Sequence, residues 1–74
     1  EDFVKKVQPK LNRVYVDPFT WASYNYDEKK GAAVTFARYI NMERGSDAEL
    51  VKIYSFQSGE KLASYNSITG FSIE

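Results

Sequence analysis

Neither cysteine nor histidine occurs in this chain of 74 residues, and this absence constrains its fold more than any other feature of the sequence. Without Cys, neither disulfides nor thiolate zinc sites can stabilise a small fold. A chain of this size buries only about 60% of the surface that its unfolded form exposes. The core must therefore come from apolar side chains, and the six Tyr, five Phe and one Trp are expected to supply much of it.

Catalytic chemistry is restricted in the same way. The lack of His removes the commonest general base near neutral pH, and the joint lack of His and Cys excludes Ser-His-Asp triads, Cys-His dyads and imidazole metal sites. The carboxylate pairs Asp27–Glu28 and Asp47–Glu49 remain, and their surroundings are typical of solvated turns. The sequence thus predicts a protein that is not an enzyme and has no catalytic residues, no metal and no cofactor.

The balance of charges bears on the class of partner. Ten Lys and Arg residues offset ten Asp and Glu residues, which argues against a dedicated nucleic-acid binder with a basic face. No apolar run approaches the ~18–20 residues of a membrane-spanning helix. The lack of Cys fits a cytoplasmic or bacterial protein. We expect one small domain over residues 1–74, whose partner is another protein or a second copy of itself.

Strand-like patterns cover most of the chain. A short helix is expected at the N-terminus, where Asp2 caps it and Pro9 ends it. The Asp27–Gly31 stretch is typical of a hairpin loop. Apolar alternation and aromatic content predict strands over residues 12–17 and 19–26, a hairpin over 50–65 with its turn at 57–60, and a last strand over 71–73.

Residues 32–42 fit two structures. As a helix, this segment places Ala33, Phe36, Ala37 and Ile40 on one stripe, with a cap at Asp27 and an end at Gly45. As a strand, it places Thr35, Ala37, Tyr39 and Asn41 on one face. Its Ala residues favour the helix, whereas its β-branched and aromatic residues favour the strand, and Gly31 would weaken a helix by close to 1 kcal/mol relative to Ala. We favour the strand.

The predicted fold class is therefore mainly β. We expect a small antiparallel meander or partly closed barrel of four to five strands with a short N-terminal helix. The alternative is an α+β fold in which a helix near residues 28–44 packs on the sheet.

Residues 45–65 carry a local pattern of their own. Gly45-Ser46-Asp47 precedes the strand-like Val51–Tyr54, and Ser58-Gly59 forms a turn before Leu62. This pattern resembles the second half of a WD-repeat blade, with Tyr54-Ser55 in place of Trp-Asp and without the family's Gly-His pair. The resemblance implies that the chain is a fragment of a larger β-rich protein, because a single blade cannot bury its own faces.

Aromatic residues are the best candidates for a binding surface. Trp and Tyr are enriched in binding hot spots, because they bury a large area with few torsions. We predict binding through a sheet face or edge that carries Trp21, Tyr24, Tyr26 and Tyr39. The alternative is a small barrel that binds single-stranded nucleic acid, because Lys5, Lys6, Lys10 and Arg13 lie near Tyr15 and Trp21 in the sequence.

Overall fold

The computed structural model describes residues 3–45 and 49–74. They form five strands, two α-helices and one short 3-10 helix. In chain order these are β1 (Val4–Gln8), η1 (Pro9–Leu11), β2 (Arg13–Val16), α1 (Pro18–Ser23), α2 (Tyr26–Arg44), β3 (Leu50–Ser55), β4 (Lys61–Asn66) and β5 (Gly70–Ile73).

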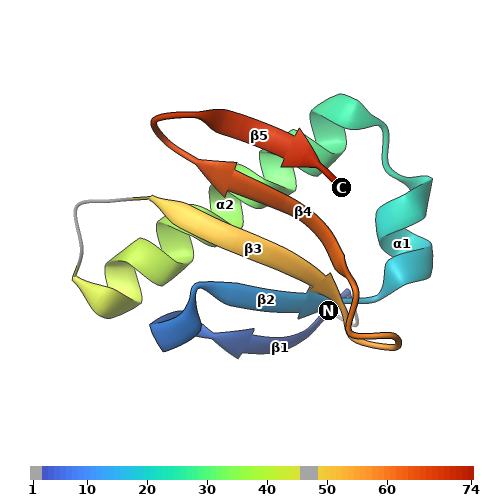
Figure 1. The fold of residues 1–74 in the computed structure, drawn as a ribbon, viewed down its shortest axis with the longest axis horizontal. Coiled ribbons are helices and arrows are strands. Elements are labelled where there is room, and N and C mark those ends of the chain that lie inside the picture. The colour runs from blue at the N-terminus through green and yellow to red at the C-terminus, as the bar shows by residue number, and fades with distance from the viewer. Residues whose placement is uncertain (1–2, 46–48) are drawn as a thin grey trace.

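The five strands form one open sheet in the order β1-β2-β3-β4-β5. β2 and β3 run parallel, because α1 and α2 connect them, and the other three neighbouring pairs are antiparallel. Figure 1 shows α2 crossing behind the sheet and α1 beyond one end of the strands, so that the near face of the sheet carries no helix. The molecule thus has two layers, a sheet and one long helix.

The core lies between α2 and the covered face of the sheet. Val14 and Val16 of β2 and Val51 and Ile53 of β3 are each no more than 1% exposed. The helix can approach these strand residues closely only where its own side chains are small. Buried residues of the helical layer are Trp21 of α1 and Ala33, Ala37 and Ile40 of α2.

Residues 32–42 are helical, so the strand prediction for them is wrong and the alternative of a helix near residues 28–44 is confirmed. Asn25, and not Asp27, caps α2: its side chain accepts a hydrogen bond from the Glu28 amide at 2.8 Å, and the Glu28 carboxylate accepts one from the Asn25 amide at 2.9 Å. Such a capping box satisfies two amides that the first turn leaves free. Gly45 ends the helix with φ +68°.

Two further elements differ from the sequence prediction. The N-terminal segment forms strand β1 and not a helix, because a register shift between Val4 and Lys6 lets Val4 and Val7 both pack against the core. Residues 19–26 do not form a strand. Pro18 begins helix α1 there, and the side chain of Asp17 caps it by accepting a hydrogen bond from the Phe19 amide.

The remaining strands are confirmed. β2 matches the strand predicted over residues 12–17, β3 and β4 match the 50–65 hairpin, and β5 matches the last strand. The sheet itself is mixed and open, whereas an antiparallel meander or partly closed barrel was expected. β3 pairs in parallel with β2, which departs from the antiparallel sheet of a propeller blade. Ser46 and Asp47, on which the WD-repeat resemblance partly depends, lie outside the described residues.

No helix within the described residues is long and apolar enough to cross a membrane.

Candidate functional site

The strands carry a net positive charge, although the chain as a whole is neutral. Their sequences contain five basic residues and no Asp or Glu, so the acidic side chains of residues 3–45 and 49–74 all lie in a helix, in a connection or at the C-terminus. The five basic strand residues are Lys5, Lys6, Arg13, Lys52 and Lys61. A charge balance taken over the whole chain therefore does not describe its individual surfaces.

Strand register places most of these cations on the face that α2 leaves uncovered. Arg13, Tyr15, Lys52 and Tyr54 alternate with the buried residues of β2 and β3, so they point to the opposite side of the sheet. Their partners on the neighbouring strands share that side. We call this surface the open face and define it by Lys6, Gln8, Arg13, Tyr15, Lys52, Tyr54, Lys61, Ser64 and Ser72.

The first row of the open face joins two cations and two aromatic rings. Lys6 pairs with Tyr15, Tyr15 with Tyr54, and Tyr54 with Lys61, so the row crosses four strands. The two Tyr rings are stacked with 5.4 Å between their centroids and 29° between their planes. The Tyr pair thus forms one aromatic surface at the centre of the sheet.

The second row is polar and basic. Gln8, Arg13, Lys52, Ser64 and Ser72 are register partners in turn and cross all five strands. Two cations therefore lie side by side on β2 and β3, one step along the strands from the Tyr pair. Two residues along a strand are about 7 Å, so the basic row runs close beside the aromatic surface.

A cation also lies over each ring of the Tyr pair. The Lys6 ammonium lies 5.8 Å from the centroid of Tyr15, and the Arg13 guanidinium carbon lies 5.1 Å from that of Tyr54. At a surface, each such contact is worth only about 0.5–1 kcal/mol. Lys6 is exposed, whereas Arg13 is half-buried and its Nε atom is buried without a hydrogen-bond partner among the described residues.

Two of the five strand cations have acidic neighbours. Lys61 forms a salt bridge of 3.5 Å with Glu74, and both side chains are well exposed. Lys5 lies near Asp17, whose pKa is lowered first by a hydrogen bond of 2.7 Å from the Thr20 hydroxyl and also by the charge of Lys5. Across the described ranges, Lys6, Arg13 and Lys52 take part in no ion pair within 4.0 Å. These three residues carry the positive charge that the open face offers to a ligand.

The residues predicted to bind a partner do not share this surface. Trp21 is buried in the core at 4% exposure, and the ring of half-buried Tyr24 lies 5.2 Å from that of Phe3. Tyr26 lies edge-on to Phe71, and exposed Tyr39 lies on α2, so both are on the helical side of the molecule. The structure does not bring the four together into one surface.

Sequence reasoning missed the Tyr15–Tyr54 pair as a site. The signal was present in both strands, since Arg13 and Tyr15 alternate with valines and Lys52 and Tyr54 alternate with Val51 and Ile53. Only the parallel pairing of β2 with β3 brings the polar and aromatic residues of the two strands side by side, and the sequence does not show this pairing.

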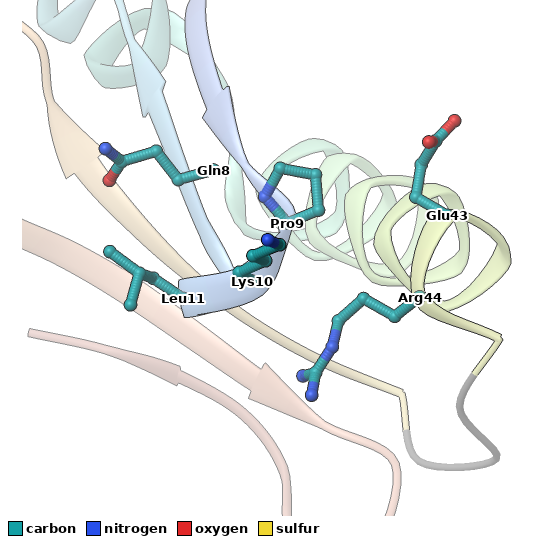
Figure 2. A pocket seen from close by; sticks show the side chains of 6 residues that line it. All are labelled: Gln8, Pro9, Lys10, Leu11, Glu43 and Arg44. Atoms are coloured by element: carbon teal, nitrogen blue, oxygen red, sulfur yellow. The ribbon is translucent and has the colours of Figure 1, made fainter.

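A hollow of about 820 Å³ lies between the β1–β2 connection and the C-terminal end of α2. Figure 2 shows its six lining side chains, with Glu43 directed away from the connection and Gln8 and Leu11 extending away from α2. The Arg44 guanidinium donates a hydrogen bond of 2.7 Å to the Asn12 side chain and is thereby held in the fold. Because Gln8, Leu11 and Glu43 diverge and Arg44 is held by Asn12, these side chains do not converge on a small ligand.

Among the described residues, no group of three or more acidic side chains is gathered in a way that could hold a metal ion. Comparisons with protein families, with curated proteins and with solved structures found no match to this chain. The open face is therefore the candidate site on the strength of its own geometry.

Proposed function

We propose that this chain is a non-catalytic binding module that takes an anionic partner on the open face of its sheet. The observation that carries the proposal is the separation of charge, with five cations and no carboxylate in the strands of a chain whose total charge is zero. A surface of one sign attracts and orients a partner of the opposite sign. The lack of His and Cys supports a binding role over a catalytic one.

Cation-exchange chromatography at pH 7 tests the charge separation without knowledge of the partner. The wild-type chain is expected to be retained despite its zero net charge, because the open face meets the resin. The triple variant Lys6→Gln, Arg13→Gln, Lys52→Gln is expected to pass through unretained. Elution of each variant is followed in one salt gradient, with circular dichroism as the check on folding.

The matched control removes the same charge elsewhere. Lys10, Lys30 and Arg38 are exposed and lie outside the sheet, so their joint replacement by Gln gives an identical net charge. This control is expected to elute near the wild type. Equal loss of retention in both variants would mean that the open face has no special role, and the proposal would be rejected.

Assembly with another protein or with a second copy is the second candidate, and one observation favours it. β5 is an edge strand of four residues with no charged side chain, and Ile73 at its end is 47% exposed. Uncharged edges invite strand addition, whereas edge lysines prevent it. The opposite edge, β1, carries Lys5, Lys6 and a register shift. Strand addition would therefore use β5.

Sedimentation equilibrium over a wide concentration range tests this second candidate. If β5 pairs with a second copy, the wild type is expected to dimerise with rising concentration, and Ser72→Lys, in the middle of the edge strand, is expected to remain monomeric. Ser67→Lys adds the same charge at an exposed position outside the strands and is expected to behave as the wild type. A wild type that is monomeric throughout contradicts self-association through β5.

A further inference from the structure

We propose that the occupant of the open face is a single-stranded nucleic acid; this rests on the function proposed above and names the class of partner. The ligand must match both properties of the surface, which are an aromatic pair and, in the rows that hold it and lie beside it, cations without an ion pair among the described residues. A single strand offers phosphates and unpaired bases with flat faces, repeated along one chain. Proteins that bind single strands combine a basic surface with aromatic side chains on which bases stack.

The order of groups on the open face suits a nucleotide. A base that stacks on the side of Tyr15 or Tyr54 that carries the cation displaces Lys6 or Arg13 from the ring. Stacking of a base on an aromatic side chain is stronger than an exposed cation–π contact, so this exchange is favourable. The displaced cation is then free to contact a phosphate of the same strand. The basic row with Lys52 runs about 7 Å from the Tyr pair. It provides further cations for the phosphate backbone of the nucleic acid.

Other polyanions use only part of this surface. A duplex keeps its bases stacked on one another, so it contacts the cations but leaves the Tyr pair without a partner. An acidic peptide likewise pairs with the cations and gains nothing from the two stacked rings. The aromatic pair is therefore the feature that favours a single strand over both.

Fluorescence anisotropy with a fluorescein-labelled oligothymidine tests the proposal, with the labelled duplex and a labelled poly-glutamate peptide as comparison probes. The single strand is expected to bind about tenfold more tightly than the duplex, the difference that stacking of one base provides. Contact of three phosphates by Lys6, Arg13 and Lys52 predicts a slope of about −2 for the logarithm of affinity against the logarithm of salt concentration.

Substitution of the Tyr pair separates stacking from charge. The double variant Tyr15→Leu, Tyr54→Leu keeps apolar strand residues and every charge, and it is expected to lose tenfold or more in affinity for the single strand. It is expected to leave retention on the cation exchanger unchanged. The matched control is Tyr26→Leu, Tyr39→Leu, which makes the same change at two exposed positions on the helical side and is expected to bind as the wild type.

The outcomes distinguish this inference from the function on which it rests. Equal binding of the single strand, the duplex and poly-glutamate, with no effect of the Tyr15 and Tyr54 substitutions, would overturn the nucleic-acid inference and leave an anion-binding face. Preference for poly-glutamate would overturn it in favour of a protein partner. A lack of oligonucleotide binding at low salt would also overturn it. If the open-face variant and its matched control are retained equally on the cation exchanger, the proposed function is overturned instead.

Discussion

The substitution Ala37→Glu is expected to leave the chain unfolded, whereas Tyr39→Glu, two residues away, is expected to change the free energy of unfolding by less than about 1 kcal/mol. Ala37 is 0% exposed at the contact between α2 and the sheet, whereas Tyr39 is 51% exposed on the same helix. Glu at position 37 would place a charge without a partner among Val51, Ile53 and their neighbours. Such a charge costs several kcal/mol.

That cost is comparable to the whole stability of a chain this small. Native domains are stable by about 0.05–0.15 kcal/mol per residue, which is roughly 4–11 kcal/mol for 74 residues. Far-UV circular dichroism and urea unfolding of both variants give the measurement. The pair of variants also separates the two structures that residues 32–42 fit, because a strand places Ala37 and Tyr39 on one face. Equal effects at the two positions would contradict the helix.

The strands that the sequence predicts correctly are those whose evidence is local. In β2 and β3 every second residue is buried, and most of these are Val or Ile, while Gly59 lies in the turn between β3 and β4 with φ +78°. The pattern needs no distant contact to be recognised, because period-two alternation with one buried face defines a strand. This is why the 50–65 hairpin is confirmed.

The N-terminal strand illustrates how a local pattern misleads. Val4 and Val7 are three residues apart, which is a helical spacing, and Pro9 follows as a helix end. The register shift in β1 places two consecutive lysines on the solvent side and so lets both valines face the core. A β-bulge has no signature in this stretch of sequence. The local pattern therefore favours a helix, and this prediction is wrong.

The local sequence of residues 32–42 predicts the wrong structure because the contacts that decide between helix and strand lie outside the segment. The capping box uses Asn25, which lies in a segment with a strand-like sequence, and burial of Ala33 and Ala37 requires a sheet for the helix to cover. Together these contacts outweigh Gly31 and the β-branched residues. The site depended on the same long-range information, since Tyr15 and Tyr54 meet only through the parallel pairing that α2 makes possible.

Trp21→Ala is expected to destabilise the fold by about 3–5 kcal/mol, which is the usual cost of removing a large aromatic side chain from a core. Trp21 is the buried residue of α1, a helix of six residues, and the Lys29 ammonium lies 5.7 Å from the centroid of its ring. Its removal therefore leaves a cavity where α1 joins the sheet and α2. Urea unfolding followed by circular dichroism measures the loss, since Trp21 is the only Trp and fluorescence disappears with it.

Trp21→Phe separates this structural role from the binding role that the sequence predicted for Trp21. Phe fills most of the same space, so the variant is expected to fold and to lose less than half of the stability that Trp21→Ala loses. If Trp21 acts only in the core, the folded Phe variant binds the labelled oligonucleotide with wild-type affinity. If it acts as an anchor for a partner, binding falls in a variant that remains fully folded, and Trp21 must then leave the core when the partner binds. Because a side chain at 4% exposure has no face free for a ligand, we expect the first result.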